Sequence, residues 1–522
     1  MLICEKIAPS GVDFLSERFD VDVELDWDAD QLKERIGDYD AIVVRSATKV
    51  TAELIDAATK LSVVGRAGTG VDNVDVEAAT RRGIVVCNAA GSNAVSAAEH
   101  AIALLLAQAR NVAHAHASLV DGRWERAKFG GIEVTGKTLG VLGFGRIGQM
   151  VAERAKGLSM EVVAYDPFVA ESRFRDLGVE RAEEPADLYA AADFISLHLA
   201  SSPQTRGFVD AEAFSQMKPT ARIINAARGD VVDQDALVQA LTDGTIAGAG
   251  IDVYPEEPTT ESPLFGLPGV VVTPHLGAST SEAQDRAGAV VAEQVAAALT
   301  GGMVTHAVNI PAVSPEALDV LGPFMPLARQ LGQLLARIAG VDSPIEISYE
   351  GRLGEEDTRL LTASVLAGMV SGAVEGPVNL VNATSLAADR GIEWAETNSP
   401  RAVDYTNRIT VRAGEVSMSG TTVGTTSRPR LVSAFDQAIE LELAPHVGIF
   451  LYQDVPGQVG RVGTILGTAD VNIASMAVSP SKREGSAAMA VTVDSPVPST
   501  VVEEIGALDG FESVWFVDLD DG

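Results

Sequence analysis

Three glycines and one aspartate have the spacing of a dinucleotide-binding turn. Gly143, Gly145 and Gly148 form a G-x-G-x-x-G pattern after an apolar run, and Asp166 ends the next apolar run. In such a turn the first glycine lets the chain reverse, the second leaves room for a pyrophosphate, and the third lets helix and strand pack closely. The aspartate can accept hydrogen bonds from both ribose hydroxyls and would repel a 2′-phosphate. The pattern therefore predicts that the chain binds NAD rather than NADP.

Three more polar residues follow predicted strands further along the chain. Arg228 comes after the run ARIIN, Glu257 after AGIDV, and His275 after VVVT. Because the carboxyl ends of parallel strands meet at one edge of a sheet, we expect the three side chains to lie beside the dinucleotide. Each alone has an ordinary explanation, as a surface cation, a turn residue or a structural histidine. Their joint position favours catalysis.

These residue types suit the oxidation of a hydroxy acid. Histidine is the usual base for a hydroxyl proton because its pKa lies near neutrality. A carboxylate such as Glu257 would fix the tautomer of His275 and stabilise its charged form. The guanidinium of Arg228 can hold a substrate carboxylate through two parallel hydrogen bonds. The spacing of histidines and cysteines predicts no metal site.

The segments that must position these residues alternate between strand-like and helix-like over roughly the first 300 residues, which predicts parallel sheets with crossover helices. We therefore expect an α/β fold with two Rossmann-like, doubly wound domains around a hinged cleft. The expected strands are 40–44, 61–66 and 83–88 in the first domain, and 194–199, 221–225, 249–253 and 270–273 in the second.

The chain is expected to cross between these two domains twice. Capping-box spacing at Ser96–Glu99 predicts one long apolar helix over 97–115, and a helix at 281–301 returns to the first domain. The expected bounds are 1–96 with 286–305 for a substrate-binding lid domain, and 97–285 for an NAD-binding domain.

Two smaller domains are predicted after a proline-rich linker. Residues 313–444 have helical patterns followed by strands, which indicates an intervening α+β domain, to which we assign a regulatory role. Residues 446–522 have the β-α-β-β-α-β order of a ferredoxin-like domain.

Composition limits the classes of partner. The net charge of −33 argues against nucleic acid, because phosphate binding requires clustered cations. No apolar run reaches the ~20 residues of a membrane span, and the N-terminus lacks the features of a signal peptide. With only two cysteines, the chain fits the cytoplasm. An anionic substrate must be held by local cations, since the overall field opposes it.

Four motifs together resemble the D-2-hydroxyacid dehydrogenases: LGFGRIG (142–148), NAARGDVVD (225–233), DVYPEEP (252–258) and TPHLGAST (273–280). The segments 43–75 and 378–392 and the C-terminal domain extend the resemblance over nearly the whole chain. They are similar to the family's long, phosphoglycerate-oxidising members, which end in an ACT domain. The resemblance implies NAD-dependent oxidation of 3-phospho-D-glycerate to 3-phosphohydroxypyruvate, the first committed step of L-serine synthesis.

The resemblance also implies site residues. Arg228, Glu257 and His275 form the catalytic triad, and the carboxylate clamp adds the backbone amides of Gly68 to Gly70. Arg45 and Ser46, just past a predicted strand, are expected to contact the phosphate. Beside the three glycines, the cofactor contacts would be Thr69, Arg146, Ile147, Asp166, Ala226 and Asp252.

Regulation and assembly are implied in the same way. Tyr452, Asp454 and Asn472 match positions that bind L-serine in the family, and ACT domains pair edge to edge across subunits. A plain dimerisation unit is the alternative. Trp124 resembles an arm that reaches a neighbouring subunit, although it could also pack within its own chain. We expect a homo-oligomer, a dimer or a tetramer.

Two rival functions remain open. The chain could be a glyoxylate or hydroxypyruvate reductase of the same family, which a substrate panel would reveal. It could also be a redox-sensing protein that binds NADH without turnover.

Overall fold

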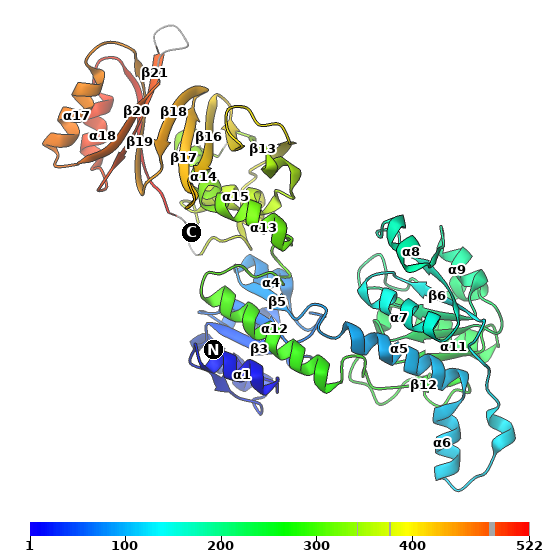
Figure 1. The fold of residues 1–522 in the computed structure, drawn as a ribbon. Coiled ribbons are helices and arrows are strands. Elements are labelled where there is room, and N and C mark those ends of the chain that lie inside the picture. The colour runs from blue at the N-terminus through cyan, green and yellow to red at the C-terminus, as the bar shows by residue number, and fades with distance from the viewer. Residues whose placement is uncertain (342, 375–376, 480–485, 521–522) are drawn as a thin grey trace.

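Within residues 1–522, apart from 342, 375–376, 480–485 and 521–522, the computed structural model forms four β-sheets, one after another along the chain (Figure 1). The first two sheets are wholly parallel, as their alternating strands and helices predict. None of the helices in these described ranges is long and apolar enough to cross a lipid bilayer.

The first sheet has the strand order β2-β1-β3-β4-β5. Strands β1, β3 and β4 are almost entirely buried apolar runs, as parallel strands covered on both faces must be, whereas the short edge strand β2 is exposed. The strands are β1 (Leu2–Ile3), β2 (Asp22–Val23), β3 (Ala41–Val44), β4 (Val63–Arg66) and β5 (Val85–Asn88). The helices are α1 (Pro9–Ser16), α2 (Ala29–Arg35), α3 (Ala52–Ala57), α4 (Val76–Arg81) and the short η1 (Ile36–Asp38).

The second sheet has the order β12-β11-β10-β9-β6-β7-β8. The chain direction across the sheet reverses between β6 and β9, and such a switch point is where open α/β sheets bind ligands. The strands are β6 (Thr138–Leu142), β7 (Glu161–Tyr165), β8 (Glu180–Arg181), β9 (Phe194–Leu197), β10 (Arg222–Asn225), β11 (Gly248–Ile251) and β12 (Val270–Val272). The helices are α7 (Arg146–Gly157), α8 (Glu171–Leu177), α9 (Pro185–Ala191), α10 (Ala211–Ser215), α11 (Gln234–Thr242) and η3 (Gly229–Val231).

Two helices join these sheets (Figure 1). Helix α5 (Ala94–Ala109) leaves the first sheet and packs against α7 and β11, while α12 (Ser281–Leu299) returns and packs against α1 and β4. The return packing is tight, because a methyl group on Gly65 would lie 2.5 Å from Val295. The expected double crossing is therefore present.

The single long helix expected over 97–115 is wrong. Helix α5 begins at Ala94, so Ser96 lies inside it and its hydroxyl contacts that of Thr280 at 2.7 Å. The helix ends at Ala109, and Asn111 is left-handed with φ 52° before α6 (Val112–Val120) begins. Asparagine tolerates that conformation, and here its side chain donates a hydrogen bond to the Gly130 carbonyl. Helix α6 and η2 (Arg126–Phe129) project from the body of the molecule (Figure 1).

The third sheet mixes a parallel pair, β13 with β14, and an antiparallel meander, in the order β14-β13-β15-β16-β17-β18. The strands are β13 (Ile345–Gly351), β14 (Trp394–Ser399), β15 (Asn407–Ala413), β16 (Val416–Val423), β17 (Arg428–Ala434) and β18 (Gln437–Glu442). The helices are α13 (Pro315–Leu321), α14 (Met325–Ala339), α15 (Arg359–Val370) and α16 (Ala383–Asp389), with η4 (Gly322–Phe324) and η5 (Arg352–Glu355). This is the expected α+β arrangement.

The fourth sheet is antiparallel, with the order β20-β21-β19-β22. It consists of β19 (His446–Gln453), β20 (Ile473–Val478), β21 (Ser486–Val493) and β22 (Phe511–Asp518), with helices α17 (Gln458–Thr468) and α18 (Ser499–Gly506) on one face (Figure 1). The element order is the β-α-β-β-α-β expected from the sequence. Val447, Ile449 and Val517 of this sheet share one apolar core with Leu331 and Ile439 of the preceding domain.

Candidate active site

The glycine-rich turn follows β6 at the switch point of the second sheet. Gly143 has φ 93°, and a methyl group there would lie 2.6 Å from the His198 carbonyl oxygen, just after β9. A methyl group on Gly148 would lie 2.1 Å from the Gly143 carbonyl oxygen. One on Gly145 would meet open space, at the start of α7. The turn thus fits a dinucleotide, since Gly145 leaves the helix N-terminus accessible to a pyrophosphate.

Asp166 follows β7, next to this turn. Its carboxylate accepts hydrogen bonds from the backbone amides of Phe144 at 2.8 Å and Phe168 at 2.9 Å. These bonds orient the carboxylate beside the glycine turn, where the ribose of a dinucleotide would lie. Arg146 and Ile147 open helix α7, as a role beside the pyrophosphate requires.

The pairing expected between Glu257 and His275 is present. Nδ1 of His275 lies 2.5 Å from Oε2 of Glu257, and the backbone amide of Tyr254 donates to Oε1 at 2.8 Å. The hydrogen bond to Glu257 raises the pKa of His275 despite partial burial. Burial raises the pKa of Glu257, but the bonds from His275 and Tyr254 outweigh it and hold the pKa below its usual value. Since Nδ1 faces the carboxylate, Nε2 is the nitrogen left for substrate.

The loop that carries His275 is held by Asp252, which is fully buried. The Asp252 carboxylate accepts hydrogen bonds from the amides of Leu276 and Gly277 and from the Thr273 hydroxyl, at 2.7, 2.9 and 2.6 Å. Its carbonyl accepts the His275 amide at 2.8 Å, and His275 is held at φ 53°. Burial alone would raise the pKa of Asp252, but these bonds and His100 keep it low.

His100 links this loop to helix α5, which joins the two sheets. Its Nε2 lies 3.1 Å from both Oγ1 of Thr273 and Oδ1 of Asp252. The sequence predicts Asp252 as a cofactor contact, and that role stays a prediction. What the structure adds is that Asp252 positions the histidine loop, while Ala226, the other predicted contact nearby, directly follows β10.

Arg228 follows β10 and points toward the first sheet. Its Nε lies 3.4 Å from Oδ2 of Asp72, and a methyl group on Gly70 would lie 2.3 Å from its Nη2. Its charge is also close enough to lower the pKa of His275 slightly, against the larger effect of Glu257. Arg228, Glu257 and His275 therefore converge, and Gly70 is the residue that makes room for the guanidinium.

The other predicted substrate residues lie at the strand ends of the first sheet. Three backbone amides, those of Arg45, Ala47 and Thr48, donate to the carboxylate of Glu5 and fix the loop that holds the exposed Ser46. The amide of Gly68 donates to the Arg66 carbonyl at 2.8 Å. The hydroxyl of Thr69, a predicted cofactor contact, donates a hydrogen bond to the side-chain oxygen of Asn93.

Sequence reasoning missed Arg66 and Glu5. Arg66 ends β4, and its largely buried guanidinium has its pKa lowered by burial and by the nearby charges of Arg228 and Arg45. Three guanidiniums therefore share this region, which suits a substrate with two anionic groups. The rule that strand ends line the crevice could have found Arg66, because it follows the run VVG directly.

The predicted effector residues do not meet within one chain. Tyr452 is near the end of β19, where Asp454 follows on an exposed loop, whereas Asn472 lies just before β20. Strands β19 and β20 run in the same direction on either side of β21; Tyr452 is level with Ala487, and Ile473 with Val493. At about 3.3 Å per residue, the two groups are roughly 20 Å apart.

Comparison with known families agrees with this geometry. The family of the D-isomer specific 2-hydroxyacid dehydrogenase NAD binding domain matches residues 102–277. The D-3-phosphoglycerate dehydrogenase intervening domain matches 320–435, and the ACT domain matches 447–510.

Relatives match the chain over its full length. A D-3-phosphoglycerate dehydrogenase of Mycobacterium tuberculosis is 43% identical over 99% of both chains. The chain belongs to the D-3-phosphoglycerate dehydrogenase family. A family member from Archaeoglobus fulgidus is 39% identical over 99% of this chain and 100% of its own. One from Arabidopsis thaliana is 40% identical over 99% of this chain and 86% of its own.

Solved structures match more than half of the chain. A protein from Thermus thermophilus has a TM-score of 0.54 and 34% identity, over 59% of this chain and 99% of its own. An NADPH-dependent glyoxylate/hydroxypyruvate reductase from Sinorhizobium meliloti has a TM-score of 0.53 and 31% identity, over 59% and 96%. The predicted fold class and the predicted NAD cofactor are confirmed by these family matches. The described part of the chain holds no cluster of three His, Cys, Asp or Glu suited to a metal ion.

Glu257→Gln should move the pH dependence of alcohol oxidation. His275 must be neutral to accept a proton, so kcat/KM falls as the pH falls through its raised pKa. Without the carboxylate, burial remains and lowers that pKa, so the acidic limb should move to lower pH. We expect kcat to fall about tenfold to hundredfold as well. Glu256→Gln, at the neighbouring exposed position, is the matched control. An unmoved limb in Glu257→Gln would show that the carboxylate does not set the pKa of His275.

Asp252→Asn should loosen the His275 loop. An asparagine presents an N–H group where the carboxylate accepts amide bonds, so the network of Leu276 and Gly277 cannot be rebuilt. We expect kcat to fall at least about tenfold, with faster hydrogen exchange at residues 273–277. Asp243→Asn, which changes an exposed carboxylate with one side-chain partner, should leave both measurements unchanged. Unaltered exchange in Asp252→Asn would contradict the anchoring role.

Proposed function

We propose that the protein oxidises 3-phospho-D-glycerate to 3-phosphohydroxypyruvate with NAD, opening L-serine synthesis. The observation that carries the proposal is the convergence of the Glu257–His275 pair and Arg228 at the strand ends of the sheet that also holds the glycine turn. The full-length relatives named D-3-phosphoglycerate dehydrogenase support the choice of substrate.

His275 is the base in this mechanism. Its Nε2 takes the proton of the C2 hydroxyl, while Nδ1 stays bonded to Glu257, which stabilises the imidazolium that forms. NAD accepts the hydride from C2. The cofactor would be held by the glycine turn and Asp166. The buried Asp252, whose pKa is low, stays ionised and keeps the histidine loop in place during proton transfer.

Arginines bind the two anionic groups of the substrate. Arg228 would hold the carboxylate, exchanging its contact with Asp72 for a bidentate one. Arg45 and Arg66 would face the phosphate, with Glu5 fixing the loop of Arg45. A glyoxylate or hydroxypyruvate reductase has no phosphate to bind, so a dedicated arginine pair favours the phosphorylated substrate. Binding of NADH without turnover remains the other alternative, and the paired base argues against it.

We propose that the chain folds into the four domains expected from the sequence. Residues 1–96 with 286–305 form the lid domain, 97–285 the NAD-binding domain, 313–444 the intervening domain and 446–522 the ACT domain. We place the protein in the cytoplasm, which the two unpaired cysteines, Cys4 and Cys87, support.

The protein is proposed to be a homo-oligomer, a dimer or a tetramer. Trp124 is 82% exposed and Val120 71% exposed on the projecting arm, so neither is packed within its own chain. Exposed apolar side chains on a projecting arm are suited to contact with a second copy. The separation of Asp454 from Asn472 supports the same idea, because a serine site made of both requires two chains.

The central proposal predicts NADH formation with 3-phosphoglycerate and at least about tenfold lower kcat/KM with substrates that lack the phosphate. His275→Ala should reduce turnover by about 10² to 10⁴, because general base catalysis contributes that much. NADH binding, followed by fluorescence, should be unchanged, since His275 is not part of the glycine turn. Activity retained in His275→Ala would remove it as the base. Equal rates with glycerate would remove the phosphate as a specificity group.

L-Serine should inhibit the enzyme through a site shared between chains. Asp454→Asn and Asn472→Ala should each abolish inhibition, while Asp470→Asn, an exposed change in the same domain, should not. Co-expression of Asp454→Asn and Asn472→Ala chains should restore part of the inhibition. In such a pair, one site receives both wild-type residues and the other receives both substitutions. Failure of the mixed enzyme to respond, with both single variants insensitive, would contradict a shared site.

A further inference from the structure

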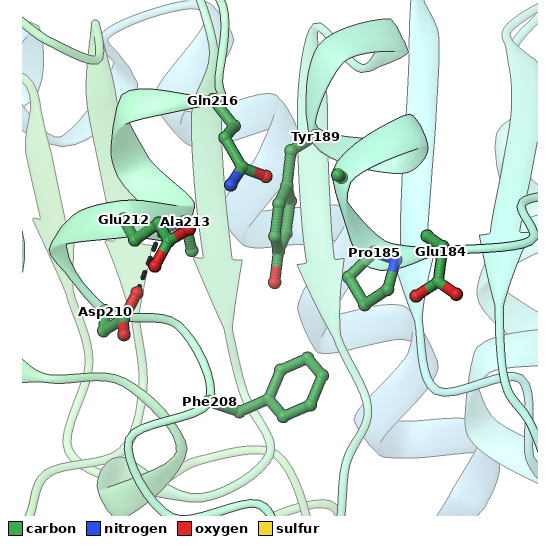
Figure 2. A pocket seen from close by; sticks show the side chains of 9 residues that line it. Glu184, Pro185, Tyr189, Phe208, Asp210, Glu212, Ala213 and Gln216 are labelled. Carbon is green, nitrogen blue, oxygen red and sulfur yellow. Dashed lines mark hydrogen bonds between the residues drawn. The ribbon is translucent and has the colours of Figure 1, made fainter.

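An open pocket of about 350 Å³ lies between helices α9 and α10, outside the site described above (Figure 2). Pockets of this size hold small organic molecules. None of its lining residues belongs to the glycine turn or the triad. They are Glu184, Pro185, Ala186, Tyr189, Phe208, Asp210, Glu212, Ala213 and Gln216.

Tyr189 gives this pocket an unsatisfied polar atom. The residue is only 3% exposed, and its hydroxyl has no hydrogen-bond partner in the described part of the chain. Figure 2 shows the hydroxyl pointing into the space bordered by Pro185, Phe208 and Asp210. A buried polar group without a partner is costly, and such groups in folded proteins are few. The hydroxyl is therefore placed to bond something that enters the pocket.

The negative charge of the lining favours a positively charged ligand. Glu184, Asp210 and Glu212 contribute carboxylates, and the lining contains no lysine or arginine. Asp210 uses one oxygen to cap α10, accepting the Ala213 amide at 3.0 Å, and its side chain lines the pocket. Burial, helped by the charge of Asp210, raises the pKa of Tyr189, so the phenol stays neutral and its oxygen can accept a hydrogen bond.

We propose that this pocket binds a small organic ammonium ion. Its N–H groups would donate to the Tyr189 hydroxyl oxygen and to the Asp210 carboxylate, and Glu212 and Glu184 add negative potential. The rings of Phe208 and Tyr189 offer apolar and cation–π contact to the same ligand. An anion would meet three carboxylates, and a neutral molecule would gain nothing from them.

The test uses benzylammonium chloride as the probe and the full-length protein with ¹³C-labelled tyrosine rings. The chain has seven tyrosines, and Tyr189→Phe identifies the resonance of Tyr189 by its loss. That resonance should shift saturably, with a Kd of about 1 mM for a ligand of this size. Benzyl alcohol and benzoate, which share the ring but not the charge, should bind at least about tenfold more weakly.

Two variants localise the binding. Tyr189→Phe removes only the hydroxyl and should raise the Kd, measured from the probe's own signals, about threefold to tenfold. Asp210→Asn keeps a residue suited to capping α10 while removing the charge, and should also weaken binding. Tyr39→Phe, which removes a hydroxyl bonded to Asp22 on the first sheet, is the matched control.

Three outcomes would overturn the proposal: no saturable shift of Tyr189 at up to about 20 mM probe, equal affinity for benzyl alcohol, or unchanged affinity in both Tyr189→Phe and Asp210→Asn. Neither variant should disturb folding, because Tyr189→Phe deletes a hydroxyl that bonds none of the described residues and Asp210→Asn retains the cap. NADH formation from 3-phosphoglycerate, which uses none of these side chains, serves as the check that each variant is intact.

Discussion

The buried carboxylate of Asp252 is the interaction on which the candidate site depends. A positive φ is uncommon in residues other than glycine. His275 is held at φ 53° by the hydrogen bond from its amide to the Asp252 carbonyl and by those from the Leu276 and Gly277 amides to the Asp252 carboxylate. In this arrangement Nδ1 of His275 bonds Glu257, which leaves Nε2 as the nitrogen for the substrate. Because His100 reaches both Thr273 and Asp252 from the helix that joins the two sheets, the loop of the base is tied to an element that both sheets share.

Electrostatics set a second constraint. The chain carries a net charge of −33, so a doubly anionic substrate approaches against the overall field. Three arginines at the strand ends of the first two sheets offset this repulsion locally. They are Arg45, Arg66 and Arg228. Glu5 and Asp72 then organise the cluster, one through backbone amides and the other through the Arg228 side chain. Binding therefore depends on placement of a few cations rather than on composition.

The sequence predicted those features that depend on local spacing and on the geometry of parallel sheets. Gly143, Asp166 and the triad all follow apolar strands, so their meeting at one edge could be expected. The break at Asn111 could not, because it depends on the segment around Gly130 that crosses the end of α5. The anchoring role of Asp252 depends on long-range hydrogen bonds, which leave no periodic signal. Asn472 and Asp454 matched a family pattern, but strand register, set by tertiary structure, places them at opposite ends of one sheet.

The apolar core common to the third and fourth sheets has a consequence for how such enzymes can be rearranged. Ile449 and Ala488 of the ACT sheet are buried in the same cluster as Leu431 and Ile439, and Gln437 accepts the Ala488 amide across the junction. Cutting the gene at the sequence boundary near Pro445 would leave an apolar surface bare on the remaining chain. A transfer of the ACT domain to another protein, in evolution or in the laboratory, therefore has to move the intervening domain with it.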